Sequence, residues 1–161
     1  MAEFAGEIAA QGRRFAVVAS RFNEQITQKL AEGAVTALLD AGAAYDDVDL
    51  VWVPGAWELP AAARALLASD RYDAIVAVGA VVRGDTPHFD FVAGEASRGL
   101  ADASAEFHTP VGFGLLTCDT MEQAEARAGG LHGNKGADAA RAAIEMADLF
   151  ARLAVDDEET G

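Results

Sequence analysis

Short apolar runs alternate with longer amphipathic segments along this chain. The runs are rich in branched or aromatic residues, which favours strands, and they cover residues 15–19, 48–53, 74–82 and 111–117. After the first run, Ile26, Leu30 and Leu38 recur at helical spacing, and Asn23 precedes them as an expected helix cap. Further helices are expected over residues 57–68, 88–105, 121–127 and 138–153. This alternation predicts an α/β protein with a four-stranded parallel sheet.

The length of 161 residues suits a single domain. We place that domain at residues 15–154, after an N-terminal arm at residues 1–14. Residues 155–161 form an acidic tail that we expect to be disordered. Residues 4–9 are a candidate for a short additional edge strand, which would lack a partner in an isolated domain.

Charge and cysteine content exclude several classes of function. The chain has 26 acidic and 12 basic residues, for a net charge of −14, so neither nucleic acid nor an anionic membrane is expected as a partner. Cys118 is alone, which excludes an internal disulfide and a cysteine-built zinc site. No stretch approaches the roughly 18 apolar residues of a membrane span, and we expect a cytoplasmic globular protein. The acidity fits adaptation to high salt and an ordinary acidic surface equally well.

Ligands of open parallel sheets bind beyond the carboxyl ends of the strands, so the loops there carry the candidate chemistry. The loop at residues 20–23 lacks glycine, which excludes a dinucleotide-binding fingerprint. It places Phe22 where a cofactor loop would lie, either to stack on a planar ring or to join the core. In the next loop, Trp57 would wall a pocket, and Glu58 would either accept hydrogen bonds from ligand hydroxyls or only favour the helix dipole.

The loop at residues 83–88 has the most informative sequence. Gly84 supplies flexibility, Thr86 is expected to cap the next helix, and Pro87 is expected at its first position. The free N–H groups of such a helix start bind anions. His88 would transfer protons there, or would be an ordinary surface histidine.

Two cations, Arg127 and Lys135, flank a glycine-rich segment that fails the pattern of a phosphate-binding P-loop. Arg127 would bind a phosphate in bidentate fashion or simply lie near a helix end. Cys118 follows a strand, and we favour apolar packing over nucleophilic catalysis for it. We assign no role to His108 and His132.

Together these loops resemble the lumazine synthase family, in order and over most of the chain. The resemblance is carried by residues 21–23, 53–60, 79–90, 110–114, 127–129 and 134–136. It implies a flavodoxin-like three-layer α/β/α sandwich without metal or cofactor. The implied reaction condenses 5-amino-6-(D-ribitylamino)uracil with 3,4-dihydroxy-2-butanone 4-phosphate to 6,7-dimethyl-8-ribityllumazine, releasing phosphate and water.

The resemblance also implies roles for individual residues. His88 would relay protons. The residues that would bind the pyrimidine and the ribityl chain are Phe22, Asn23, Ala56, Trp57, Glu58, Val81, Phe113 and Lys135. The phosphate would be bound by Gly84, Asp85, Thr86 and Arg127. In the family the counterparts of Phe113, Arg127 and Lys135 come from the neighbouring subunit, so the site would exist only in an oligomer.

Family members assemble as pentamers or as shells of twelve pentamers. Residues 127–135 carry no insertion and residues 4–9 contain no proline, so we expect the 60-mer, with residues 4–9 added to a neighbour's sheet. Riboflavin synthase is a candidate partner inside such a shell. A flavin- or lumazine-binding protein without turnover is the competing hypothesis, and the presence of both His88 and Arg127 argues against it. A structural role as a shell protein is compatible with catalysis.

Overall fold

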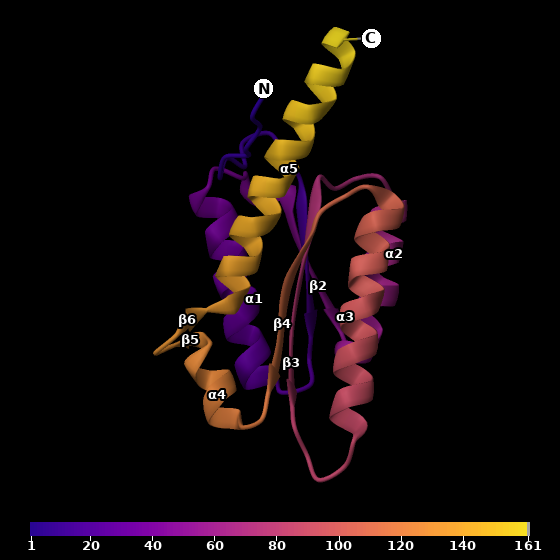
Figure 1. Ribbon diagram of the computed structural model, residues 1–161. Coiled ribbons are helices and arrows are strands. Elements are labelled where there is room, and N and C mark those ends of the chain that lie inside the picture. Colours follow the sequence, from indigo (N-terminus) through magenta and orange to yellow (C-terminus); the bar gives the residue numbers. More distant parts are fainter. Residues whose placement is uncertain (161) are drawn as a thin grey trace.

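The computed structural model describes the backbone of residues 1–160 and the side chains as far as residue 155. Four parallel strands form the central sheet in the order β2-β1-β3-β4 (Figure 1). Their bounds are β1 Phe15–Ser20, β2 Val48–Val53, β3 Ala74–Val82 and β4 Val111–Cys118. The α-helices are α1 Glu24–Asp40, α2 Leu59–Ala68, α3 His88–Phe107, α4 Met121–Ala126 and α5 Lys135–Thr160. The predicted strands are confirmed to within one residue.

Helices cover both faces of the sheet, with α1 and α5 on one side and α2 and α3 on the other (Figure 1). Side chains alternate along β1, so that Phe15, Val17 and Ala19 pack toward α1 and α5. Ala16 and Val18 pack toward α2 and α3. All six residues of β1 are buried because the strand lies between two neighbours and beneath two helical layers. The flavodoxin-like three-layer sandwich is thereby confirmed.

Glycines in β4 allow α5 to approach the sheet closely. A Cβ atom at Gly112 would lie 2.3 Å from the carbonyl oxygen of Ala139 in α5, and one at Gly114 would lie 3.2 Å from Cβ of the same residue. Only glycine leaves room for this contact. The alternation of glycine with larger residues in β4 therefore reflects helix packing on one face.

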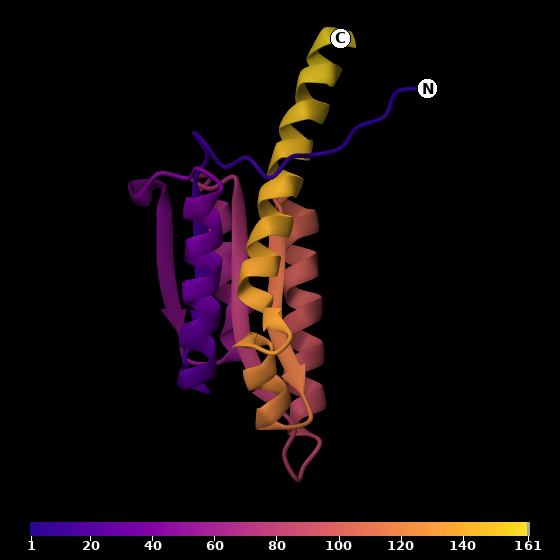
Figure 2. The same ribbon diagram turned by 90° about the vertical axis from the view of Figure 1, so that its left-hand side faces the viewer.

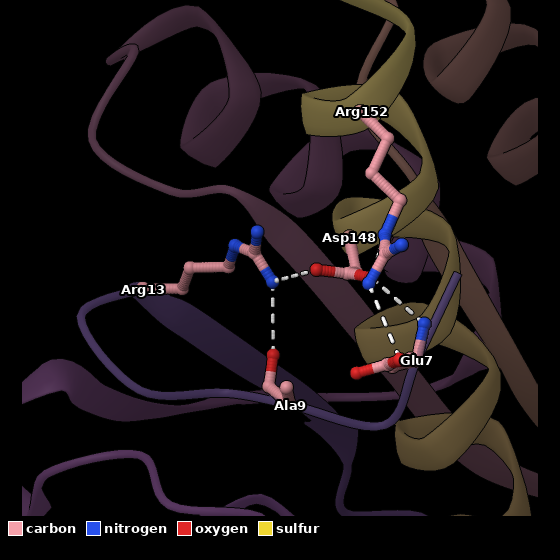
Figure 3. Close-up of polar contacts among 5 residues, drawn as sticks. All are labelled: Glu7, Ala9, Arg13, Asp148 and Arg152. Atoms are coloured by element: carbon pink, nitrogen blue, oxygen red, sulfur yellow. Dashed lines mark hydrogen bonds and ion pairs between the residues drawn. The ribbon is translucent and has the colours of Figure 1, made fainter. Parts of the chain in front are cut away.

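The N-terminal arm contains no strand within this chain and lies across α5 instead (Figure 2). A cluster centred on Asp148 of α5, hereafter the Asp148 cluster, attaches it (Figure 3). Asp148 accepts hydrogen bonds from the Glu7 N–H at 2.8 Å, from Arg13 Nη1 at 3.0 Å and from Arg152 Nε at 2.8 Å. Arg13 also donates to the carbonyl oxygen of Ala9 at 2.9 Å. The pairing of residues 4–9 with a neighbour's sheet stays a prediction.

Helix α5 continues to Thr160, beyond the end of the sheet (Figure 1). The disorder expected over residues 155–161 is therefore not observed as far as Thr160, and Gly161 lies outside the described residues. The sequence offers no stop signal earlier, because neither glycine nor proline occurs between residues 137 and 160. Within the described part of the chain, no helix combines the length and apolarity needed to cross a membrane.

Candidate active site

A cavity of about 710 Å³ opens where β1, β2 and β3 end. We call it the first cavity. Seven of the predicted site residues line it, namely Phe22, Ala56, Trp57, Val81, Gly84, Thr86 and His88. Further apolar walls come from α3, through Phe89, Phe91 and Val92. The cavity therefore suits a flat, largely uncharged ring system.

Backbone hydrogen bonds between the first two loops hold Phe22 at the edge of the first cavity. The N–H of Arg21 donates to the Val53 carbonyl at 2.8 Å, and the N–H of Phe22 donates to the Pro54 carbonyl at 3.1 Å. Phe22 is 71% exposed, so the alternative of a core residue is wrong. An exposed aromatic ring on a fixed backbone presents a face on which a planar ligand can stack.

Asn23 departs from its predicted behaviour. It occupies the N-cap position of α1 with a left-handed backbone, φ 62°, and its side chain does not cap the helix. The amide instead donates to the Ala80 carbonyl at 3.1 Å. The expected cap is wrong because this conformation turns the side chain toward β3. Asn23 thus joins the Phe22 loop to the strand beneath the cavity and does not line it.

Glu58 belongs to a short 3-10 helix, Ala56–Glu58, that leads directly into α2. Pro60 lies in the first turn of α2, where its missing N–H leaves no helical hydrogen bond unmade. A Cβ atom at Gly55 would lie 3.3 Å from Oε2 of Glu58, which places the carboxylate over the start of this loop. No hydrogen bond or ion pair within the described residues uses this carboxylate, so its acceptors are free for a ligand.

The loop at residues 84–87 leads into α3, which begins at His88. Pro87 takes the N-cap position and no side chain caps the helix, so the prediction of a Thr86 cap with Pro87 inside the helix is wrong by one position. In the described part of the chain, the N–H groups of Gly84, Asp85 and Thr86 have no backbone or side-chain acceptor. Asp85 is exposed and does not line the cavity. The loop therefore offers free donors beside His88.

The remaining predicted residues lie elsewhere, in a second cavity of about 430 Å³ between β4 and the start of α5. Phe113, Arg127 and Lys135 line this second cavity, and none of its lining residues belongs to the first. Arg127 donates to the Gln123 carbonyl at 3.0 Å. No carboxylate of the described residues pairs with Arg127 or Lys135, so both cations are available to an anion.

Two further residues, His132 and Cys118, line the second cavity. His132, for which the sequence indicates no role, is one of them, and its backbone N–H donates to the Ala126 carbonyl at 2.8 Å. It lies between the short strands β5, Ala128–Gly130, and β6, Gly133–Asn134. Burial raises the pKa of the Cys118 thiol, which keeps it protonated near neutral pH and supports a packing role.

Comparison with known proteins gives the family of the chain. The profile of the 6,7-dimethyl-8-ribityllumazine synthase family matches residues 12–151. The chain belongs to this family. The 6,7-dimethyl-8-ribityllumazine synthase of Gemmatimonas aurantiaca is 68% identical over 152 residues, which cover 94% of this chain and 93% of that protein. The enzyme of the same name from Aquifex aeolicus is 49% identical over 150 residues, covering 93% of this chain and 97% of its own length.

Family membership confirms the resemblance and the reaction that it implied. The protein is a transferase of riboflavin biosynthesis that forms 6,7-dimethyl-8-ribityllumazine from two small-molecule substrates. The competing hypothesis of a binding protein without turnover is thereby set aside.

Proposed function

We propose that this condensation takes place in an active site shared by two chains, with the first cavity of one chain facing the second cavity of its neighbour. The separation of the two cavities carries this proposal. Phe22 and His88 line one of them, whereas Phe113, Arg127 and Lys135 line the other. The resemblance assigns all five residues to a single reaction, yet the two cavities share no lining residue within one chain.

The first cavity would bind the pyrimidine. Its ring would stack on the exposed face of Phe22, while the backbone at Ala56 and Val81 would form hydrogen bonds with the ring edge. The unpaired carboxylate of Glu58 would accept hydrogen bonds from the ribityl hydroxyls, together with the neighbour's Lys135. Trp57, which is 59% exposed, would close the side of the pocket.

The phosphate of the second substrate would bind at the start of α3. Free N–H groups at Gly84, Asp85 and Thr86 precede a helix of 20 residues, whose dipole favours an anion at this end. The neighbour's Arg127 would add two parallel hydrogen bonds to the phosphate oxygens. These unpaired local charges would draw an anion toward a chain whose net charge is −14.

Catalysis would combine proximity with proton transfer. The steps are imine formation between the amine and the ketone, loss of phosphate, ring closure by the second amine and loss of water. Holding both substrates in contact can supply much of the acceleration, since it replaces a bimolecular encounter. His88, at the first position of α3, would move protons between these steps and add about 10²–10⁴-fold.

We further propose that the chain assembles into a 60-mer. Apolar side chains remain exposed beside β4, among them Phe113 at 43% and Phe150 at 38%, which line a common hollow and support contact with another copy. The uninterrupted segment at residues 127–135 supports the closed shell, and riboflavin synthase is its proposed enclosed partner. Light scattering that gives only the mass of a pentamer would contradict the shell.

Replacing Arg127 tests the proposed site. Arg127→Ala should lower kcat/KM for the phosphate-bearing substrate by about a hundredfold or more, because a charge-assisted bidentate contact is lost. KM for the pyrimidine should change little. Arg71→Ala, at the opposite end of the sheet, is the matched control and should leave both constants unchanged. Unaltered kinetics of Arg127→Ala with the phosphate substrate would refute the proposal.

A further inference from the structure

Arg83 lies at the junction between β3 and the loop at residues 84–87. Its N–H donates to the Cys118 carbonyl at 2.8 Å, which extends the pairing of β3 with β4 by one residue past the Val82–Cys118 pair. The backbone of Arg83 is therefore fixed, and the loop begins immediately after it.

The Arg83 side chain contacts two other segments. Its Nε donates to Oδ1 of Asp119 at 2.8 Å, in the turn between β4 and α4. On the other side, Nη1 lies 3.4 Å from Oδ1 of Asp90, and Cζ lies 4.4 Å from the centre of the Phe89 ring. The first turn of α3 and the turn before α4 are thus joined through one guanidinium group.

Asp119 is itself held in place. Its N–H donates to Oε1 of Gln123 in α4 at 2.8 Å. Phe89 is 9% exposed and forms part of the wall of the first cavity. Arg83 therefore contacts a fixed carboxylate at one end and a fixed ring at the other, although it lines neither cavity.

The segment between these anchors has few contacts of its own. Residues 84–87 are exposed, and at the far end the N–H groups of Asp90 and Phe91 donate to the Pro87 carbonyl, at 3.0 and 3.4 Å. Exposed ion pairs contribute little to global stability, so the contacts of Arg83 matter chiefly for the geometry of this loop.

We infer that Arg83 is a positioning residue for the phosphate subsite, because it holds the loop at residues 84–87 so that the free N–H groups point at the bound anion. This inference rests on the proposed function of that loop. A direct phosphate contact is disfavoured, since Asp119 and Asp90 already neutralise the guanidinium. Loss of a preorganised loop weakens ligand binding even where every ligand-contacting group is retained.

The test replaces Arg83 by Met, which keeps much of the alkyl chain and removes the charge and the donors. Arg83→Met should raise KM for the phosphate substrate about tenfold, and raise the inhibition constant of inorganic phosphate in parallel. KM for the pyrimidine and kcat should stay within about twofold. KM of Arg83→Lys for the phosphate substrate should lie between those of the parent protein and Arg83→Met, since lysine keeps the charge and lacks the planar guanidinium group. Asp119→Asn should reproduce the effect, and adding it to Arg83→Met should cause no further loss.

Arg98→Met is the matched control. Arg98 lies on α3, away from the first cavity, and also pairs with two carboxylates, those of Glu95 and Asp102. The Arg98→Met substitution should leave both KM values unchanged. An unchanged KM for the phosphate substrate in Arg83→Met would overturn the inference, as would equal changes in both KM values together with a lower melting temperature. If Arg127→Ala raises that KM and Arg83→Met does not, the proposed function stands and only the role of Arg83 fails.

Discussion

Replacing Asp148 by Asn tests how the N-terminal arm is attached. The side chain keeps its shape and loses its charge. In the folded protein the Glu7 N–H, Arg152 and Arg13 lower the pKa of Asp148 from 3.8 to about 2. Asp148 is only 7% exposed, so this shift is weakly screened. A shift of nearly two pKa units corresponds to about 2 kcal/mol at neutral pH, which is the expected loss of unfolding free energy.

The stabilisation by Asp148 should depend on pH. Because the pKa of Asp148 is lower in the folded state than in the unfolded state, its stabilisation is complete above about pH 5 and is lost as the pH falls toward 2. The difference between the parent protein and Asp148→Asn should be about 2 kcal/mol at pH 7 and about half that at pH 3.

Urea unfolding followed by circular dichroism measures this difference. Equal protein concentrations are needed, because the stability of an oligomer depends on concentration. Asp138→Asn is the control, since Asp138 pairs with Arg141 on the exposed face of the same helix, and it should cost less than about 1 kcal/mol. A difference for Asp148→Asn that is equal at pH 7 and pH 3 would refute the electrostatic account.

Three further substitutions test the packing and the chemistry. Gly112→Ala should destabilise the protein by about 2 kcal/mol or more in a thermal melt, because its Cβ would lie 2.3 Å from the Ala139 carbonyl oxygen. Ser20→Ala should raise the unfolding free energy by about 1 kcal/mol, since the Ser20 hydroxyl is fully buried and has no hydrogen-bond partner among the residues that the structure describes. His88→Ala should slow lumazine formation, followed by absorbance, by about 10²–10⁴-fold and leave measurable turnover.

The sheet and its helices could be predicted from the sequence because local pattern and tertiary environment agree. The run at residues 74–82 is apolar throughout, and β3 is a central strand covered on both faces. The hairpin of β5 and β6 could not be predicted, since strands of three and two residues are too short to show a period. Charge alone does not predict where α5 ends, because neither glycine nor proline interrupts the segment between residues 137 and 160.

The candidate site was predictable as a set of loops, whereas its internal contacts were not. The side chain of Asn23 bonds to Ala80, 57 residues away, and the side chain of Arg83 to Asp119, 36 residues away. Contacts between residues so far apart leave no recognisable local pattern in the sequence. Only the fold brings these partners together at the carboxyl edge of the sheet. The same limit applies to His132, whose place beside Arg127 and Lys135 follows from the hairpin.

Subunit mixing tests the shared active site most directly. Phe22→Asp disables the first cavity and Arg127→Ala the second, so each variant alone should be nearly inactive. When equal amounts are dissociated and reassembled together, about a quarter of the interfaces should combine two intact cavities, because neighbours pair at random around a ring. The mixture should therefore recover about a quarter of the parent activity. Activity no higher than the mean of the two variants, in particles shown to contain both chains, would contradict a site built from two subunits.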